Sequence, residues 1–344
     1  MNKTEKPRGE LALIEQIRRG NGRRFAAVPL GIGDDCAILR PPAGCEVLVT
    51  TDFTLENRHF RRDLHPAESV GHRCLARGLS DLAAMGATPL AAFLSLALPR
   101  EMVESKAGRK WVERFFWGLR ALADRHRVPL AGGDTAESPT GLILADIVLV
   151  GAAPTGRALR RSRAKAGDAL YCTGKLGGAA AELAEMFGIG RMRPAAGREG
   201  HPQMFPEPRI GVGAALLRRG LATGCLDISD GLSTDLGHLC QESGVDALLE
   251  EAALPIHPLA AKLGVEAGLK MALHGGEDYE LLFSAAADQK IPRSIRGVEI
   301  TQIGSLKRRR RGQPRITLVG ADGARRALET GGWEHFTSAT GNCQ

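Results

Sequence analysis

Acidic residues stand beside glycines or directly after apolar runs in six short segments, and this pattern constrains the fold more than any other feature. The segments are Gly31–Asp35, Thr50–Asp52, Leu79–Leu82, Gly132–Thr135, Asp227–Gly231 and Gly275–Asp278. An acid just beyond a strand lies where α/β sheets open their ligand crevice. One such segment is most often an Asp-Gly turn or a helix cap, but six predict an α/β protein with a carboxylate-rich ligand site.

The length of 344 residues predicts two domains, because a domain usually holds about 100 to 200 residues. Gly151–Gly167 is rich in glycine and basic residues, as inter-domain connections are, so we place the domains at 1–153 and 154–344. Residues 191–208 show no periodicity and are expected to form a mobile loop. The expected strands are 46–51, 90–98, 142–150, 169–173, 247–249 and 279–283, and the expected helices begin after Pro66 and at 101–126, 179–186, 211–221 and 232–240.

No apolar run reaches the roughly 18 residues that span a bilayer, and Met1–Glu10 is polar. We therefore expect a cytoplasmic protein that does not enter a membrane. The seven cysteines include no CxxC pair, which favours reduced thiols over disulfides or a zinc site. Cys36 is expected to be a core thiol.

The net charge of +7 raises the alternative of a polyanionic partner such as a nucleic acid. The excess is partly local, in Lys307–Arg311, which is expected to be a solvated hairpin tip. No RNA-binding aromatic signature or helix-turn-helix pattern accompanies it, and the acidic segments would repel phosphate unless they held metal ions. We expect no nucleic-acid partner.

Carboxylates that converge need counter-charge, since two of them about 4 Å apart repel by about 4 kcal/mol at an effective dielectric of about 20. Oxygen ligands with hydroxyl neighbours and few histidines favour Mg²⁺ over zinc. One Mg²⁺ ion usually takes only one or two carboxylates together with substrate phosphates, so this many acids predict several ions bridging a nucleotide.

Familiar nucleotide and hydrolase motifs are missing. A P-loop would need Ser or Thr in place of Leu176. The segment Gly31–Cys36 lacks the third glycine of a dinucleotide-binding motif, and neither HExxH nor GxSxG occurs. The segment Thr173–Gly178 opens a helix after a strand, and both an anion at the helix start and a plain tight turn fit it.

Seven motifs follow one another in order, within a match that runs from about Gly9 to Phe336. They are Gly31–Ala37, Thr50–Asp52, His59-Phe60, Leu79–Ala87, Gly132–Thr135, Asp227–Leu232 and Gly275–Leu281. Together they resemble the thiamine-monophosphate kinases, within the ATP-binding superfamily of aminoimidazole ribonucleotide synthetase and selenophosphate synthetase. The resemblance implies a two-domain aminoimidazole ribonucleotide synthetase-like fold, with an α/β N-terminal domain whose strands pair across a homodimer and an α+β C-terminal domain. It also implies transfer of the ATP γ-phosphoryl group to thiamine monophosphate.

Roles for single residues follow from the same resemblance. Metal ions would be held by Asp35, Thr50, Thr51, Asp52, Asp81, Asp134, Asp227 and Asp230. ATP would contact Gly133, Asp134, Arg161 and Ser229, and thiamine monophosphate would contact His59, Glu277 and Trp333. The catalytic set would be Asp52, Asp134, Asp230 and Arg161, in a direct in-line transfer without a phosphoenzyme.

The chain departs from the family pattern in two loops. Leu55-Glu56-Asn57 stands where Val-Glu-Gly is usual, and Ala136-Glu137 stands where Thr-Arg is common, which adds a negative charge near the nucleotide.

Trp333 could instead pack the tail, and the acceptor could be that of another superfamily enzyme. Selenophosphate synthetase is disfavoured because no reactive cysteine followed by lysine stands near the N-terminus. Aminoimidazole ribonucleotide synthetase is disfavoured by His59-Phe60 and Gly275–Leu281.

Overall fold

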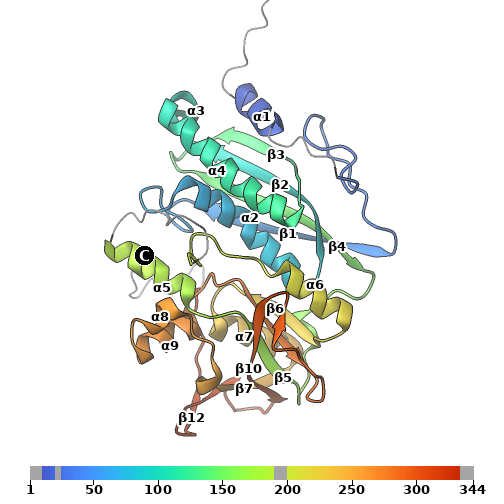
Figure 1. The fold of residues 1–344 in the computed structure, drawn as a ribbon, viewed down its shortest axis with the longest axis vertical. Coiled ribbons are helices and arrows are strands. Elements are labelled where there is room, and N and C mark those ends of the chain that lie inside the picture. The colour runs from blue at the N-terminus through green and yellow to red at the C-terminus, as the bar shows by residue number, and fades with distance from the viewer. Residues whose placement is uncertain (1–9, 20–24, 190–199, 334–344) are drawn as a thin grey trace, which may run out of the picture. The chain divides into compact units, whose positions relative to one another are not determined.

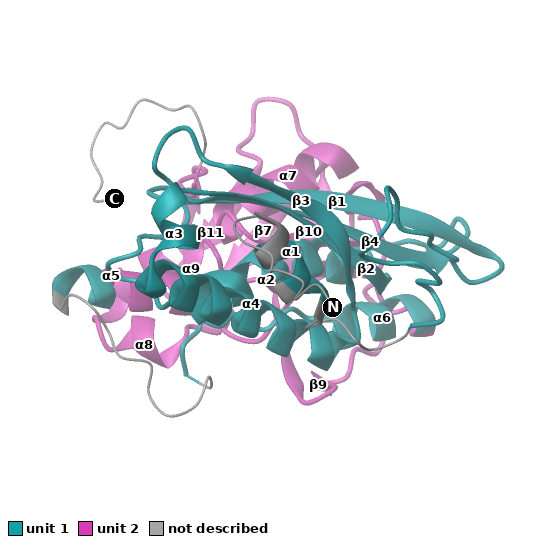
Figure 2. Cartoon of the chain, turned by 90° about the horizontal axis from the view of Figure 1, so that it is seen from above, with its two compact units in different colours: residues 1–158, 185–218 teal, residues 159–184, 219–344 magenta. Residues whose placement is uncertain are grey.

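The computed structural model describes residues 10–19, 25–189 and 200–333 (Figure 1). The chain divides into two compact units, unit 1 with residues 1–158 and 185–218 and unit 2 with residues 159–184 and 219–344 (Figure 2). It therefore leaves unit 2 within α5 (Gly178–Ile189) and returns to it at the end of α6 (Ile210–Arg219). The domain boundary between residues 153 and 154 stays a prediction, and the compact units divide the chain at other positions.

Unit 1 is built on a four-stranded sheet with the strand order β1-β4-β2-β3. The first three of these strands pair antiparallel, and β3 runs parallel to β2. Helix α2 packs on one face of the sheet, and α4 packs on α2. The elements are α1 (Glu10–Arg19), β1 (Cys45–Leu55), α2 (Ala67–Ala84), β2 (Thr88–Leu98), α3 (Arg100–Glu104), α4 (Lys106–His126), β3 (Leu130–Glu137) and β4 (Leu144–Pro154).

Strand β1 has one buried and one exposed face. Leu48 and Thr54 are buried on the face that α2 covers, whereas Val47, Val49 and Phe53 are exposed on the other face. Because side chains alternate along a strand, Thr50 and Asp52 share the covered face and Thr51 shares the exposed one.

The helix expected over 101–126 is two helices, because Ser105 caps the second. The Ser105 hydroxyl accepts a hydrogen bond from the backbone N–H of Gly108 at 2.9 Å, which starts α4 anew after α3. The helix ends at Arg127, whose φ of 54° is left-handed. The sequence pattern predicted the apolar face of this region but missed the cap that interrupts it.

Two glycines allow α2 and α4 to approach closely. A Cβ atom on Gly118 would lie 1.9 Å from the carbonyl oxygen of Glu68, and one on Gly71 would lie 1.9 Å from that of Phe115. Both helices therefore pack backbone to backbone at this crossing, which fixes α4 against α2.

The segment 191–208 was expected to be a mobile loop, and residues 191–199 of it lie outside the described residues. The part that is described is packed: Met204 and Phe205 are buried in a cluster with Leu64 and Met186. The expectation is wrong for this part, since apolar residues without a helical or strand period still bury themselves in a satellite core.

Unit 2 contains a sheet with the path β12-β11-β7-β10-β5-β8-β6, and β9 pairs with β10. Only β11 and β7 pair parallel in it. Helix α7 supplies Leu232, Leu236 and Leu239 to the core beside this sheet. The elements are η1 (Arg161–Arg163), β5 (Ala169–Thr173), β6 (Gly224–Ile228), α7 (Leu232–Ser243), β7 (Val245–Glu250), η2 (Glu251–Ala253), α8 (Pro258–Ala261), α9 (Val265–His274), β8 (Glu280–Ala285), β9 (Ser294–Ile295), β10 (Val298–Arg308), β11 (Ile316–Val319) and β12 (Arg325–Ala327).

The basic run Lys307–Arg311 is not a hairpin tip, which corrects the expectation from the sequence. β10 and β11 do not pair with each other, because β7 lies between them in the sheet. The run is also tied to its neighbour strand: Arg309 Nη1 donates to Asp246 Oδ1 at 2.8 Å, and the backbone N–H of Arg310 donates to Asp246 Oδ2 at 2.9 Å. Part of the positive charge is thus paired with an acid of β7.

The described cysteines are free thiols as the sequence predicts, but one of them is exposed where the sequence predicts burial. The six cysteines of the described ranges are free thiols, and Cys343 lies outside those ranges. Cys36 is exposed, however, so its assignment as a core thiol is wrong.

Candidate active site

Three predicted site residues meet between β1 and α2. The Thr50 hydroxyl donates to Asp81 Oδ2, and Asp52 lies close enough to Asp81 to hydrogen-bond with it. Burial and the neighbouring Asp81 raise the pKa of Asp52 to about 7, although the Arg77 guanidinium, whose Nε is 3.7 Å from Asp52 Oδ1, lowers it in part. The sequence did not single out Arg77.

Thr51 lies on the opposite face of β1 from Thr50 and Asp52. Its hydroxyl donates to Asp146 Oδ1 on β4 at 2.6 Å. Asp146 was not among the predicted residues, although an acid inside the apolar run Leu142–Val150 was a visible signal. The structure therefore divides the predicted metal positions of β1 between two faces of the sheet.

A cavity of about 750 Å³ in unit 1 brings Asp35, Gly133 and Asp134 together. Its lining also includes the apolar side chains of Phe93 and Phe116 and the basic Arg18. A Cβ atom on Gly133 would lie 1.9 Å from the carbonyl oxygen of Leu94, and its φ of 141° is a conformation that other residues rarely adopt. The acids and close backbone on one side, with apolar walls on the other, suit a nucleotide.

His59 lies in a short loop after β1 that folds back on itself. Its ring Nδ1 accepts from the backbone N–H of Leu55 at 3.0 Å, while the backbone N–H of His59 donates to the carbonyl oxygen of Leu55 at 2.8 Å. A neutral His59 that accepts at Nδ1 carries its proton on Nε2, which makes Nε2 a donor. Asn57 makes the turn with a left-handed φ of 64°.

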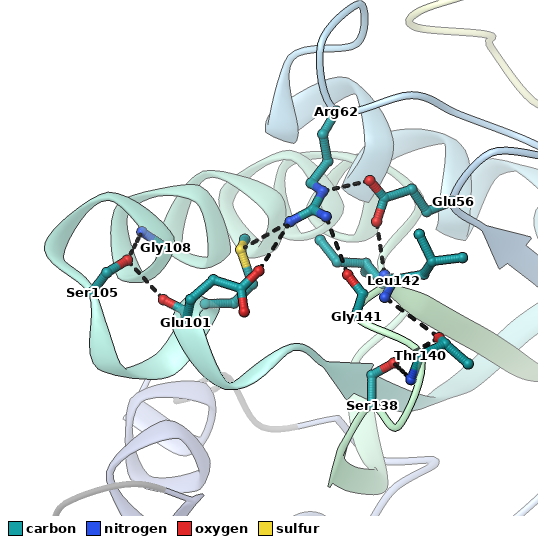
Figure 3. A network of polar contacts seen from close by, with 11 residues as sticks. Glu56, Arg62, Glu101, Ser105, Gly108, Ser138, Thr140, Gly141 and Leu142 are labelled. Atoms are coloured by element: carbon teal, nitrogen blue, oxygen red, sulfur yellow. Dashed lines mark hydrogen bonds and ion pairs between the residues drawn. The ribbon is translucent and has the colours of Figure 1, made fainter.

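The loop that carries His59 is held by the ion pair of Glu56 and Arg62 (Figure 3). Arg62 Nη2 also donates to the carbonyl oxygen of Gly141 at 3.2 Å, and its Nη1 lies 3.7 Å from Glu101 Oε1. The second oxygen of Glu56, which is buried, accepts from the backbone N–H of Ile143 at 2.8 Å. These contacts tie the loop to α3 and to the β3–β4 connection.

In unit 2, Asp227, Ser229 and Asp230 belong to the turn between β6 and α7. Asp235 organises this turn, because its Oδ2 accepts from the backbone N–H groups of Ser229, Asp230 and Gly231, each at 3.0 Å. Burial and the neighbouring Asp227 and Asp230 raise the pKa of Asp235 to about 8, against these hydrogen bonds. Asp235 was missed, since an acid in the first turn of a helix is common.

Glu277 lies beside the same turn. Its backbone N–H donates to the carbonyl oxygen of Ser229 at 2.7 Å, and that of Tyr279 donates to Ile228 at 2.9 Å. Glu277 and Tyr279 have left-handed φ angles of 67° and 51°. Two such residues around Asp278 cost of order 1 kcal/mol each, and strain of this kind concentrates at functional sites.

Asp278 decides between the two interpretations of Thr173–Gly178. Its carboxylate accepts from the backbone N–H groups of Gly177 at 2.6 Å and Ala179 at 3.2 Å, at the start of α5. Burial raises the pKa of Asp278 to about 7, although these hydrogen bonds lower it. A side chain of the protein thus occupies the helix start, and the segment is a capped turn.

Trp333 contacts the Asp230 turn and lines a second cavity. Its backbone N–H donates to the carbonyl oxygen of Asp230 at 3.0 Å, and its side chain is 43% exposed. The cavity has about 520 Å³ and is also lined by Thr234, His238 and Arg315. An exposed indole at a cavity beside Asp230 has a face that a ring can stack on.

Arg161 belongs to η1 and its side chain is exposed. The carbonyl oxygen of Arg161 accepts from the Ser243 hydroxyl at 2.6 Å, which fixes the backbone of η1 against the end of α7.

The donors of unit 1 fit Mg²⁺ in small groups. Over residues 10–19, 25–189 and 200–333, no three His, Cys, Asp or Glu side chains gather so as to hold a metal ion by themselves. Asp52 and Asp81 with the Thr50 hydroxyl form one oxygen group, and Asp35 and Asp134 line the larger cavity. One or two carboxylates completed by phosphates and waters are the usual set for Mg²⁺.

No helix in the described part of the chain is long and apolar enough to cross a membrane.

Known proteins resemble this chain along nearly its whole length. The family model of the AIR synthase related protein N-terminal domain matches residues 33–154, and that of the C-terminal domain matches residues 165–316. The thiamine-monophosphate kinase of Escherichia coli (strain K12) is 37% identical over 96% of this chain and 99% of its own length. Both halves of the chain are thus covered by one relative.

Solved structures also resemble this chain along most of its length. The crystal structure of the thiamine-monophosphate kinase from Stenotrophomonas maltophilia K279a has a TM-score of 0.76 and 35% identity, covering 92% of this chain and 97% of that one. The structure titled AaThiL complexed with AMPPCP and TMP has a TM-score of 0.72 and 28% identity, covering 95% and 97%. The expected aminoimidazole ribonucleotide synthetase-like fold is confirmed, and the chain belongs to the thiamine-monophosphate kinase family.

Proposed function

We propose that this protein phosphorylates thiamine monophosphate with ATP, giving thiamine diphosphate and ADP. The observation that carries the proposal is the match to the Escherichia coli enzyme over 96% of this chain. The related AaThiL holds AMPPCP together with TMP, so that protein binds a nucleotide and an acceptor at once. ATP is the co-substrate.

The cavity lined by Asp35, Gly133 and Asp134 supports a role in holding ATP and its metal ions. In unit 2, Asp227, Ser229 and Asp230 take the metal and nucleotide roles of the family, and Arg161 adds a fixed positive charge. Glu277 and Trp333 take the acceptor role together with His59. This assignment is supported by the hydrogen bonds that link Glu277 and Trp333 to the turn Ser229–Asp230.

The transfer we propose is a direct in-line displacement. A phosphate oxygen of thiamine monophosphate attacks the γ-phosphorus of ATP, the bond from that phosphorus to the β-γ bridging oxygen breaks, and ADP leaves. No general base is needed, because a phosphate monoester is already ionised near neutral pH. Bound Mg²⁺ ions would neutralise the two approaching anions. Asp52, Asp81, Asp134 and Asp230 hold positions from which carboxylates could bind these ions.

We also propose a homodimer formed through the open face of the unit 1 sheet. Val47, Val49 and Phe53 stand in a row on β1, an edge strand, and are 50%, 65% and 61% exposed. Exposed apolar rows of this kind mark interaction sites, and an edge strand offers backbone groups for pairing.

The six free thiols favour a reducing compartment, so we propose that the protein acts in the cytoplasm.

The test is product analysis by chromatography after incubation with ATP, Mg²⁺ and thiamine monophosphate, with free thiamine as a parallel acceptor. Equal amounts of thiamine diphosphate and ADP from the monophosphate alone support the proposal. ADP without thiamine diphosphate would mean that the γ-phosphoryl group passes to water and not to thiamine monophosphate.

A further inference from the structure

Arg77 stands at the acidic pair of β1 and α2, and nothing described so far gives it a role in the reaction. Its Nε lies 3.7 Å from Asp52 Oδ1, and the two side chains are 16% and 25% exposed. Arg77 and Asp81 lie four residues apart on α2, so they project from one face of the helix one turn apart. The same face thus presents both a cation and an anion to Asp52.

Gly78 explains why this face comes so near the strand. A Cβ atom on Gly78 would lie 2.4 Å from Leu149 Cδ1 and 3.6 Å from Thr50 Cγ2. The helix therefore approaches the sheet closely at Gly78, the residue that follows Arg77. The Arg77 side chain is only 16% exposed beside the carboxylate, so it has less freedom than a long side chain on the surface.

Arg77 alone does not balance the charge at this place, because one guanidinium stands beside two neighbouring carboxylates, Asp52 and Asp81. The pair therefore still attracts a divalent cation. A Mg²⁺ ion binds carboxylate oxygens at about 2.0–2.1 Å, so it needs the lone pairs that the guanidinium faces.

We propose that Arg77 is a built-in competitor of Mg²⁺ at the Asp52–Asp81 pair: it pairs with the Asp52 carboxylate when the metal ion is absent and sets how much metal ion the enzyme needs. The inference rests on the proposed function in one respect, namely that this pair binds Mg²⁺ during the reaction. Arg77 is in this sense a positioning residue with two opposite effects: it stabilises the metal-free protein, and it weakens the binding of the metal ion.

The test measures metal binding directly. Mn²⁺, an ion with similar oxygen preference, is titrated into the metal-free full-length protein and followed by electron paramagnetic resonance. We expect Arg77→Gln to lower the Mn²⁺ dissociation constant at this pair about tenfold, since a repelling unit charge is removed. Arg77→Lys keeps the charge and is expected to stay within about twofold of the wild type. Arg326→Gln, which removes a charge paired with Glu251 in unit 2, is the matched control and is expected to change nothing.

Thermal unfolding gives a second readout without any substrate. We expect Arg77→Gln to unfold at a lower temperature than the wild type in EDTA and to recover in excess Mg²⁺, because the metal ion replaces the lost cation. Unchanged or weaker Mn²⁺ binding would overturn the proposal. So would a variant that fails to fold both with and without Mg²⁺, because Arg77 would then be a plain packing contact.

Failure of the proposed function is visible separately. A wild-type protein that forms no thiamine diphosphate would refute the kinase assignment while leaving the Mn²⁺ and unfolding results interpretable. An active wild type with an Arg77→Gln variant of unchanged metal affinity would refute only the role of Arg77.

Discussion

The Asp235 carboxylate accepts a hydrogen bond from the backbone N–H of Asp230 at 3.0 Å, and two more N–H groups of the same turn point to the same oxygen. Asp235 is buried and lies in the first turn of α7. It therefore fixes the backbone that carries Asp230 and Ser229, although the sequence offered no distinctive sign of it.

Replacing this acceptor is expected to cost activity as well as stability. Asp235→Ala leaves three N–H groups without their acceptor and should lower the free energy of unfolding by about 3 kcal/mol. Turnover should fall more than tenfold under conditions where the variant is folded, as measured by denaturant unfolding and steady-state kinetics. Asp235→Asn keeps an acceptor oxygen and should recover part of both. The control is Asp322→Asn, whose carboxylate accepts from Ala324 in an exposed loop. If Asp235→Ala kept normal turnover, the turn would not need this support.

The Glu56–Arg62 pair predicts an effect on KM for thiamine monophosphate that is not shared by KM for ATP. Arg62→Met leaves the buried Glu56 carboxylate without its cation, which should cost about 2 kcal/mol of stability and loosen the loop that carries His59. KM for thiamine monophosphate should rise, while KM for ATP should change little. The matched control is Arg61→Met in the same loop, because Arg61 pairs with the exposed Asp63. Equal effects of both variants on KM for thiamine monophosphate would contradict the role of the pair.

Substituting the carboxylates that we propose as metal ligands should remove activity without loss of folding. Asp52→Asn removes one of two repelling acids, so we expect undiminished stability in the absence of Mg²⁺ together with loss of turnover. Asp230→Asn should likewise abolish turnover with little change in folding. Circular dichroism melts and product formation are the two measurements. Near-normal turnover in both variants would refute the assignment of these carboxylates to metal ions.

The cap at Asp278 predicts a pH dependence of stability. Burial raises the pKa of Asp278 from 3.8 to about 7, so the folded state holds this proton more tightly than the unfolded state. Its contribution to stability is therefore full below pH 3.8 and is lost as the pH rises through about 7. Asp278→Asn does not titrate, so its stability relative to the wild type should improve between pH 5 and pH 8 in urea unfolding. A difference that stays constant over this range would mean that Asp278 is ionised throughout.

Gly118 tests the close packing of α2 and α4, and Gly188 in α5 is its control. Gly118→Ala would place its methyl group 1.9 Å from the carbonyl oxygen of Glu68 and should destabilise the protein by about 3 kcal/mol. Gly188→Ala in α5 meets open space and should stabilise it by about 0.5 kcal/mol. Urea unfolding of the two variants gives the comparison, and similar values for both would show that the crossing can relax.

Much of the fold was predictable because apolar periodicity reports burial. The strands near 46–51, 90–98, 142–150 and 169–173 and the helix after Pro66 all occur, with ends that differ by a few residues. β3 was not predicted, because Leu130–Glu137 contains two glycines and two acids and has little apolar pattern. The β7 insertion between β10 and β11 could not be predicted either, because strand order depends on contacts between distant segments.

The site was predictable as a set of residues but not as a geometry. Sequence motifs name Thr50, Thr51 and Asp52 as one group, yet alternation along β1 sends Thr51 to the other face, towards Asp146. Arg77 and Asp235 act through packing and hydrogen bonds with residues of the motifs, and neither contact is visible in a linear pattern.

Phosphorus NMR of a reaction mixture tests the central claim most directly. Metal-free protein is supplied with ATP and thiamine monophosphate, and the reaction is started with Mg²⁺. We predict that the monophosphate signal disappears as the two coupled signals of thiamine diphosphate and those of ADP grow in equal amounts, and that free thiamine in place of the monophosphate gives no phosphorylated product. Release of inorganic phosphate without thiamine diphosphate, or equal phosphorylation of free thiamine, would contradict the account.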